Sequence, residues 1–341
     1  MKKNILIATG IFPPDIGGPA QYALNIFNVW KKEDHFVKVA TYNYERNFPS
    51  GIRHLLYFIK LIIKGFNADF VFVLDTFSAA IPAMYFCKIF GKKYIIRTGG
   101  DFLWEAYVER TGKKVLLRNF YKTELDNFSQ KERKIFNFTK KVLNSASYVI
   151  FSTDWQKNIF EEAYSLDKTK NSVVENYCGE RLIQVTPINR VFIAGARNLK
   201  WKNTDFLKDA FNEASVKIKK LGLQDIELSL ENKKYQNFLE TIRISYAVVL
   251  ISLGDISPNM IFDAIRAGVP FIVTKEVGTY ERIKDIAIFV DPLDKDDIVE
   301  KIVWLADPNN RSVQVKKVKN FNFTHNWEEI AGEILEVGNK I

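Results

Sequence analysis

The sequence predicts an α/β protein built from two doubly wound parallel sheets. Short apolar runs rich in β-branched residues alternate with longer amphipathic stretches, as expected for strands joined by crossover helices. The alternation loosens once, through 179–182 and 186–189, and then restarts. A chain of 341 residues also exceeds the usual size of a single core. We therefore expect one domain over 1–183, a second over 184–322 and a final helical segment over 323–341.

The first domain begins with a strand and continues as strands separated by helical stretches. Strands are predicted over 5–9, 36–41, 70–74, 93–97, 147–151 and 172–175, and the helices between them include 20–30, 52–65 and 79–90. A Rossmann-like parallel sheet with helices on both faces accounts for this order.

The second domain repeats the pattern in fewer residues. Strands over 190–194, 226–230, 247–252, 271–274 and 287–290 alternate with helices over 204–221, 235–245 and 279–286, and helices over 295–306 and 327–337 close the chain. Only one strand is predicted between Lys202 and Ala247, so this domain is expected to be shortened. Two such domains joined by a short linker would face each other across a cleft. Ligands bind outside the carboxyl ends of the strands in sheets of this kind.

The loop and helix over 255–270 carry the most chemistry. Ser257 is a good N-cap, Pro258 suits the first helical position, and a glycine and a proline end the helix. The N-terminal turn, with Asn259 and Met260, would offer backbone N–H groups to a phosphate. This segment therefore predicts an anion site.

Two carboxylates flank this anion site, Asp255 in the loop and Asp263 in the helix. They could be ordinary solvated residues, because Asp263 has an i,i+3 partner in Arg266. The helix is short and mostly apolar, however, and leaves little free surface for a carboxylate. That composition favours a role for both acids in ligand binding.

Glycines mark the loop after the first strand. Gly17 and Gly18 open a helix there and would let the backbone approach a ligand closely; a turn that merely requires glycine is the alternative. The loop lacks the G-x-G-x-x-G pattern of dinucleotide sites, and the second strand ends at Thr41 without the acid that would hold an adenosine ribose. Nicotinamide chemistry is therefore disfavoured.

Charged residues follow two further strands. Asp101 and Glu105 come after the fourth strand, where either could orient a hydroxyl or act as a base, and Asp101 could instead cap the next helix. Arg197 and Lys202 follow the first strand of the second domain, where Arg can fork onto phosphate oxygens and Lys adds a point charge. A solvated basic loop is the alternative for this pair, but its place at the expected ligand edge favours phosphate.

The amino-acid composition limits which kinds of binding partner are expected. Two cysteines and three scattered histidines indicate neither a disulfide framework nor a metal site, so we expect a cytoplasmic protein. No apolar run reaches membrane-spanning length. The net charge of +9 favours anionic partners such as nucleotide phosphates or an acidic bilayer. Nucleic acid is not expected, because no recognition motif accompanies the basic residues.

Two stretches have the composition of amphipathic basic helices. Basic residues between Arg110 and Lys141 interleave with leucine and aromatic side chains, so this stretch would either lie on an anionic membrane or be solvated. Residues 55–64 look similar, but there we expect a buried crossover helix.

The order of these motifs resembles glycosyltransferase family 4, also called group 1, of the GT-B fold, and the resemblance covers most of the chain. The family's Glu-x7-Glu signature with a following Gly-x-Pro is matched by Asp255, Asp263 and Gly268–Pro270, with both acids shortened to Asp. The family's Gly-Arg…Lys loop is matched by Arg197 and Lys202, with one residue inserted before the Arg. Weaker matches are the early glycine loop and the segments 150–155, 173–176, 278–281 and 323–327.

This resemblance implies retaining transfer of a sugar from a nucleotide-sugar to an acceptor hydroxyl, with no cofactor and no obligatory metal. Arg197, Lys202 and the N–H groups of 257–260 would stabilise the diphosphate leaving group. Asp263 would bind the ribose hydroxyls, and Asp255 would contact the sugar.

The resemblance also assigns roles to the first domain. Gly17 and Gly18 would approach the phosphates, and Asp101 stands where the family often has a His, so it is the candidate for the acceptor or sugar contact. The C-terminal helix would pack on this domain. The acceptor would be a glycan or a lipid-linked glycan at the inner membrane face, with an anionic membrane surface as a candidate partner.

Two alternatives stay open. One is another GT-B enzyme, such as a nucleotide-sugar epimerase. The other is a non-catalytic nucleotide-sugar-binding member, an alternative that the shortening of both acids keeps open.

Overall fold

The computed structural model describes residues 2–15, 17–195, 199–231 and 235–341, which form two compact units. The N-terminal unit comprises Met1–Leu103, Asp126–Asn176 and His325–Ile341, and the C-terminal unit comprises Trp104–Leu125 and Tyr177–Thr324. This division differs from the expected domain boundaries mainly in one segment. Trp104–Leu125 groups with the C-terminal unit, although it lies within 1–183.

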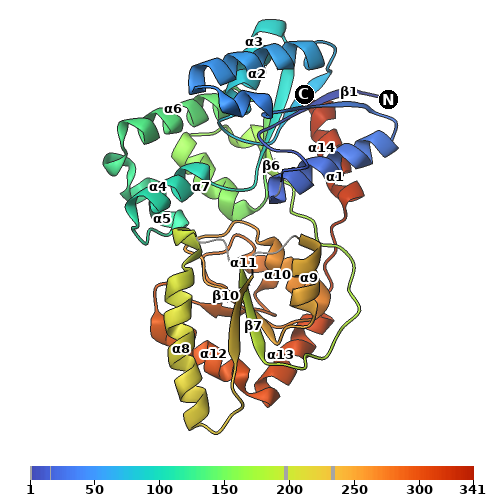
Figure 1. Cartoon of the computed structure of the whole chain (residues 1–341). Helices are drawn as coiled ribbons and strands as arrows, with labels where there is room; N and C mark the ends of the chain where they lie inside the picture. Colours follow the sequence, from blue (N-terminus) through green and yellow to red (C-terminus); the bar gives the residue numbers. More distant parts are fainter. Residues whose placement is uncertain (1, 16, 196–198, 232–234) are drawn as a thin grey trace. The chain divides into compact units, whose positions relative to one another are not determined.

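A parallel sheet forms the core of the N-terminal unit. Its strands are β1 (Asn4–Thr9), β2 (Phe36–Thr41), β3 (Phe70–Val73), β4 (Lys93–Thr98), β5 (Tyr148–Phe151) and β6 (Asn171–Val173). In the described part of the chain they pair in the order β2-β1-β3-β4-β5-β6, and every pairing is parallel. The helices of this unit are α1 (Gly18–Lys32), α2 (Ser50–Gly65), α3 (Ala80–Phe90), α6 (Gln130–Ser145), α7 (Asp154–Tyr164) and α14 (Trp327–Lys340) (Figure 1).

A second parallel sheet forms the core of the C-terminal unit. Its strands are β7 (Val191–Gly195), β8 (Glu227–Glu231), β9 (Ala247–Leu250), β10 (Phe271–Thr274) and β11 (Ile288–Val290), paired in the order β11-β10-β9-β7-β8. The helices are most of α4 (Phe102–Thr111), α5 (Leu117–Thr123), α8 (Thr204–Lys220), α9 (Tyr235–Arg243), α10 (Asn259–Ala267), α11 (Tyr280–Ile283), α12 (Lys295–Ala306) and α13 (Pro308–Asn320). Helices α8 and α12 lie side by side (Figure 1). As expected, β8 is the one strand described between Lys202 and Ala247.

Both sheets share one topology. Numbered within each unit, the strands follow the order 2-1-3-4-5, and β6 extends the N-terminal sheet. The winding direction therefore reverses between β1 and β3 and again between β7 and β9. Loops that leave the carboxyl ends of such a strand pair diverge, and sheets of this class bind ligands there. The predicted fold class, two doubly wound α/β sheets, is confirmed.

The C-terminal helix returns to the N-terminal unit, as expected. Helix α14 packs against α1 (Figure 1). The Trp30 indole N–H donates to the carbonyl oxygen of Ala331 at 3.2 Å, and the rings of Tyr22 and Trp327 meet edge to face at 5.3 Å. Asn326 and Glu329 form a capping box that starts the helix where the chain turns back.

Two helices differ from the sequence expectation. Helix α2 is buried on one face only, because large apolar side chains lie exposed on the opposite face, so the expectation of a buried crossover helix is wrong in part. Helix α13 was not predicted, since its apolar residues follow no clear helical period. Its start does carry the usual signals, an Asp307 side chain that caps it and Pro308 in the first turn. Among the described residues, no helix is both long and apolar enough to span a bilayer.

Candidate functional site

Lys202 and Asp255 meet where the C-terminal sheet reverses its winding. Lys202 ends the short helix η4 (Lys200–Lys202) after β7, and Asp255 lies in the loop after β9. Lys202 Nζ lies 2.7 Å from Asp255 Oδ2, and both side chains are largely buried. The same ammonium group lies 4.2 Å from the ring centroid of Trp201. Burial and the Trp201 ring restrict this ion pair, which presents a cation and a carboxylate side by side.

The backbone of Asp255 is held by the segment after β10. The Asp255 N–H donates to the carbonyl oxygen of Glu276, and the Gly278 N–H donates to the carbonyl oxygen of Asp255, both at 2.9 Å. The Glu276 carboxylate in turn accepts a hydrogen bond from Arg118 Nε at 2.7 Å. Burial raises the pKa of Glu276, and the neighbouring Arg118 guanidinium opposes that shift. Glu276 is thus a buried acid beside Asp255.

Sequence reasoning missed both Glu276 and Arg118. A signal existed for Glu276, because an acid soon after the apolar run of β10 lies at the ligand edge of the sheet. No comparable signal marks Arg118, which comes from a distant part of the chain.

Residues of α4 and α5 pack against the loop that precedes Asp255. A Cβ added at Gly254 would lie 2.7 Å from Leu117 Cβ and 3.2 Å from the Trp104 ring. The Leu117 N–H donates to the carbonyl oxygen of Leu253 at 3.3 Å, and the ring centroids of Trp104 and Trp201 are 5.6 Å apart. The segment Trp104–Leu125 therefore supports both loops at the switch point, and Gly254 is required for that close approach.

Helix α10 begins in the loop after Asp255. Its N-cap is Pro258, with no side-chain hydrogen bond, so the predicted N-cap role of Ser257 is wrong. The helix begins at Asn259, which places Ser257 one residue too early to cap it. Gly268 ends the helix in the left-handed conformation at φ 68°, as predicted.

The N-terminal turn of α10 adjoins the end of β7. The first N–H groups of an α-helix have no intrahelical acceptor, and here they belong to Asn259 and Met260. A Cβ added at Gly195 would lie 3.9 Å from Met260 Sδ. These N–H groups therefore lie at the same sheet edge as the Lys202–Asp255 pair.

Asp263 lies in the middle of α10, one turn beyond its N-terminal residues. Its carboxylate is buried and pairs with Arg266, one helical turn on, at 3.1 Å. Arg266 also donates to the carbonyl oxygen of Glu180 at 3.1 Å and lies 5.5 Å from the Tyr177 ring centroid. The i,i+3 partner weighed from the sequence is therefore present, although the pair is buried. Its role toward a ribose stays a prediction.

The glycine-rich loop of the N-terminal unit is braced by an ion pair. Asp15 accepts two hydrogen bonds from Arg46, at 2.6 and 2.9 Å, which hold the pKa of its carboxyl below the ordinary value. Arg46 also donates to the carbonyl oxygen of Gly10. Gly17 caps α1 at φ 153°, a conformation that favours glycine, and Gly18 is the first helical residue.

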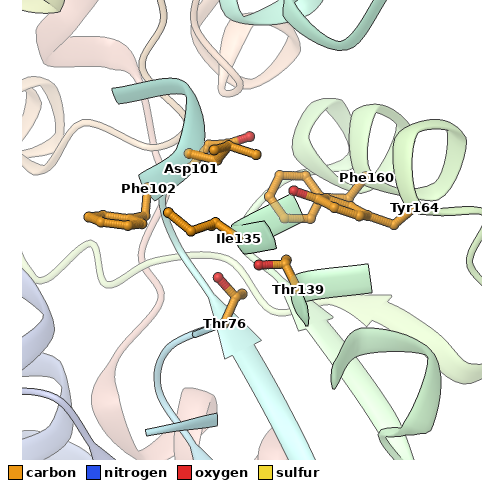
Figure 2. A pocket seen from close by; sticks show the side chains of 8 residues that line it. Thr76, Asp101, Phe102, Ile135, Thr139, Phe160 and Tyr164 are labelled. Atoms are coloured by element: carbon orange, nitrogen blue, oxygen red, sulfur yellow. The ribbon is translucent and has the colours of Figure 1, made fainter. Parts of the chain in front are cut away.

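Asp101 lies just before α4 and is buried. It lines a cavity of about 10 Å³, which is about the size of one water molecule. Phe160 and Tyr164 of α7 line the same cavity (Figure 2). Thr139 of α6 lines the same cavity.

Arg97, at the carboxyl end of β4, is a charged residue that sequence reasoning passed over. Its side chain is buried, donates to Ser152 Oγ at 2.9 Å and to Asn176 Oδ1, and lies 4.0 Å from the ring centroid of Tyr22. Burial lowers its pKa. A charge in an otherwise apolar strand run was the available signal.

The structure brings together part of the predicted site. Lys202, Asp255 and 257–260 share one sheet edge of the C-terminal unit, whereas Asp263 pairs with Arg266 farther along α10. Arg197 lies outside the described residues. Gly17, Gly18 and Asp101 belong to the N-terminal unit. In the described part of the chain, no group of three His, Cys, Asp or Glu residues is placed to hold a metal ion.

The basic stretch between Arg110 and Lys141 buries much of its apolar content, although Leu125 and Phe138 are exposed. Leu117, Phe120 and Tyr121 are buried. Several of its cations have protein partners, such as Lys113 with Glu124 at 2.9 Å, Arg118 with Glu276, and Lys114 at 3.6 Å from the Phe206 ring centroid. Contact of this stretch with a membrane stays a prediction.

Solved structures share this fold over nearly the whole chain. Sucrose-phosphate synthase from Thermosynechococcus elongatus is 11% identical with a TM-score of 0.70, and 100% of this chain and 99% of that one are covered. HepE of Anabaena, solved in complex with UDP-glucose, is 15% identical with a TM-score of 0.63, covering 99% and 98%. WaaG, a glycosyltransferase involved in lipopolysaccharide biosynthesis, is 12% identical with a TM-score of 0.66, covering 98% and 99%.

These neighbours are GT-B glycosyltransferases, and the chain has the GT-B fold. No protein-family profile matches the sequence, and no curated protein sequence matches it.

Proposed function

We propose that this protein is a glycosyltransferase that moves a sugar from a nucleotide-sugar to an acceptor hydroxyl with retention of configuration. The Lys202–Asp255 pair beside the N-terminus of α10 carries this proposal, because it lies at the switch point where sheets of this topology bind ligands. The neighbours with this fold support it, among them HepE in complex with UDP-glucose.

The chemistry follows from the charges at that sheet edge. Transfer breaks the bond between the anomeric carbon and a phosphate oxygen and forms a bond from that carbon to the acceptor oxygen, whose hydroxyl proton passes to the departing diphosphate. Negative charge develops on the diphosphate as it leaves. Lys202 Nζ and the N–H groups of Asn259 and Met260 can stabilise that charge, and Arg197 is predicted to assist. These cationic groups are our reason to propose transfer without an obligatory metal or a cofactor.

Asp255 has two tasks in this proposal. Its Oδ2 accepts from Lys202 and so orients the ammonium group, while the carboxylate contacts the sugar. The backbone bonds from the Glu276–Gly278 segment keep the shortened side chain in place. This anchoring of the backbone supplies a reason why an Asp can stand where the family has a Glu.

The remaining assignments are also proposals. Asp101 is proposed to contact the acceptor or the sugar, and Gly17 and Gly18 to approach the phosphates. The acceptor is proposed to be a glycan or a lipid-linked glycan in cell-surface polysaccharide or glycolipid synthesis, reached from the cytoplasmic face of the membrane.

One observation favours a second candidate, a protein that binds nucleotide-sugars without transferring the sugar. The Asp263 carboxylate, proposed to hold the ribose, is already engaged by Arg266. If the ribose does not displace that contact, the donor would be bound differently from the way the family resemblance implies.

The test is nucleotide release from a panel of nucleotide-sugars, with and without membrane extract as a source of acceptor. Lys202→Met and Asp255→Asn are compared with Lys208→Met. Lys208 provides the matched control because it also pairs with an aspartate, Asp205 at 2.9 Å, but on an exposed helix face. We expect the parent protein to release nucleotide. Lys202→Met and Asp255→Asn should each release it about 10²-fold more slowly, and Lys208→Met should release it at the parent's rate.

Other outcomes separate the alternatives. A nucleotide-dependent thermal shift without any release, even with extract added, supports the binding protein. Interconversion of the donor sugar without transfer supports an epimerase. If the protein binds no nucleotide, the proposal that this sheet edge is a nucleotide-sugar site is wrong.

A further inference from the structure

Arg97 is a buried cation of the N-terminal unit that no carboxylate neutralises. It lies at the carboxyl end of β4 and is 7% exposed. In the part of the chain that the structure describes, no acidic side chain lies within ion-pair distance of it. Asp101, the nearest acid along the chain, lines the small cavity beside Phe160 instead. A buried charge without an opposite charge is costly, so something else must compensate for it.

The protein satisfies one part of the Arg97 guanidinium. Nη2 donates to Ser152 Oγ at 2.9 Å and to Asn176 Oδ1, and the Tyr22 ring covers one face. Nε is buried without an acceptor, and Nη1 donates to none of the described residues. A guanidinium has five N–H groups, and Nη2 carries two of them. The N–H groups of Nε and Nη1 are therefore left for another acceptor.

Gly99 leaves Nη1 uncovered. A Cβ added at Gly99 would lie 2.6 Å from Arg97 Nη1, which is too close for two non-bonded atoms. The φ angle of Gly99 is not in the left-handed region, so the backbone conformation does not require glycine there, whereas this close approach does. Gly99 is itself exposed. The missing side chain therefore opens a path from the surface of this unit to Nη1, which we call the Gly99 opening.

The turn that contains Gly99 is held by buried polar side chains. Thr98 Oγ1 donates to the carbonyl oxygen of Gly100 at 3.0 Å, and Gln156 Nε2 donates to the same oxygen at 3.4 Å. Ser152 Oγ donates to the carbonyl oxygen of Thr98 at 3.3 Å. Because these three side chains are buried, the turn and the cation are preorganised. Preorganisation reduces the free-energy cost of ordering a site when a ligand binds.

We infer that Arg97 binds an acidic group of the acceptor, a phosphate or a carboxylate, through Nη1 at the Gly99 opening. A hydrogen bond from a guanidinium to either group is short and strong, and partial burial strengthens it further. A neutral hydroxyl would leave the charge of Arg97 uncompensated. That the anion belongs to the acceptor rests on the proposed function, in which Lys202 and α10 of the C-terminal unit take the donor diphosphate. The anion site itself does not depend on sugar transfer.

The experiment is a saturation-transfer NMR titration of the full chain, without donor, with glucose, glucose 6-phosphate and glucuronate. The two acidic probes distinguish a phosphate from a carboxylate, and glucose shows what the sugar ring contributes. The test variants are Gly99→Ala, which covers Nη1 and keeps the charge, and Arg97→Met, which removes the charge. Their controls are Gly332→Ala, at an open position of the same unit, and Arg110→Met, which removes an exposed positive charge.

We expect the parent protein to bind at least one acidic probe about tenfold more tightly than glucose. Each test variant should lose that preference, because the charge-assisted hydrogen bond is gone, and both controls should keep it. Equal affinity of the parent for all three probes would overturn the inference. An equal loss in Arg110→Met and Arg97→Met would also overturn it, because the overall charge of the chain would then explain the binding.

Melting temperatures without probe separate binding from folding. Arg97→Met is expected to be less stable than the parent, and Gly99→Ala keeps the test decisive if that variant does not fold. Lower melting temperatures with unchanged probe binding would show that Arg97 has a structural role alone, contrary to the inference. Nucleotide release tests the proposed function separately. A parent protein that prefers an acidic probe but releases no nucleotide would keep the anion site and lose its assignment to an acceptor.

Discussion

The ammonium group of Lys202 lies 2.7 Å from the carboxylate of Asp255, in a part of the C-terminal unit that is largely closed to water. Both charged groups are therefore largely desolvated, and their mutual attraction compensates for the lost hydration. Lys202 ends the short helix η4 and Asp255 lies in a separate loop, so the geometry of the pair depends on the packing around it.

Breaking this ion pair should cost more stability than breaking an exposed one. We expect a double-mutant cycle on Lys202→Met and Asp255→Asn to give a coupling free energy of about 2 kcal/mol. The same cycle on Lys208 and Asp205, which are far more exposed, should give about 0.5 kcal/mol. Urea unfolding of the four variants of each cycle measures both energies. Equal coupling in the two cycles would mean that water reaches the Lys202–Asp255 pair.

Gly254 and Gly332 should respond in opposite ways to alanine. A Cβ at Gly254 would overlap Leu117 Cβ at 2.7 Å, so Gly254→Ala should destabilise the protein by about 2 kcal/mol. At Gly332, inside α14, the added Cβ would meet no atom within 4 Å beyond its own helix backbone and chain neighbours, so Gly332→Ala should stabilise by about 0.5 kcal/mol or more. Thermal unfolding of the two variants tests both signs. A neutral Gly254→Ala would show that α5 can move away from the loop.

The ionisation of Glu276 should make the protein less stable as the pH rises. Burial raises its pKa above the ordinary value of 4.5, so above pH 4.5 the folded state holds the proton more tightly than the unfolded state does. Stability contributed by this group is therefore present at and below pH 4.5 and is lost as the pH rises through the folded-state pKa.

The measurement is urea unfolding of the parent protein and Glu276→Gln from pH 4.5 upward. We expect the variant to gain stability relative to the parent with rising pH and then to level off. A relative gain by the parent instead would mean that the attraction of Arg118 outweighs burial.

Arg97 should not tolerate lysine. Its guanidinium donates to Ser152 and Asn176 while it stacks on Tyr22, and a lysine ammonium cannot make the same set of contacts. We expect Arg97→Lys to cost about 2 kcal/mol in the free energy of unfolding. Arg110→Lys is the control, since Arg110 also lies over a ring, that of Tyr107 at 5.1 Å, but is exposed. Equal costs at the two positions would mean that burial does not matter for Arg97.

The fold followed closely from local patterns. Apolar runs such as 70–74 and 271–274 have the composition of strands buried on both faces, and the structure forms β3 and β10 there. The end of α10 at Gly268 was also predictable, because the left-handed conformation that ends a helix favours glycine. The start of α10 was misplaced by one residue, since Ser257 and Pro258 offer overlapping start signals and the tertiary fold chooses between them.

The amino-acid order alone was enough to predict two doubly wound sheets, because period and capping are local properties of the chain. It also predicted that Lys202 and Asp255 belong to one sheet edge, because strand ends in a parallel sheet meet.

Only the tertiary structure shows that these two residues form an ion pair, that Arg118 reaches Glu276 from a distant segment, and that α2 exposes a second apolar face. Each of these depends on which side chains are brought together through space. Hydrophobic periodicity marks a face as apolar without saying whether a neighbour covers it.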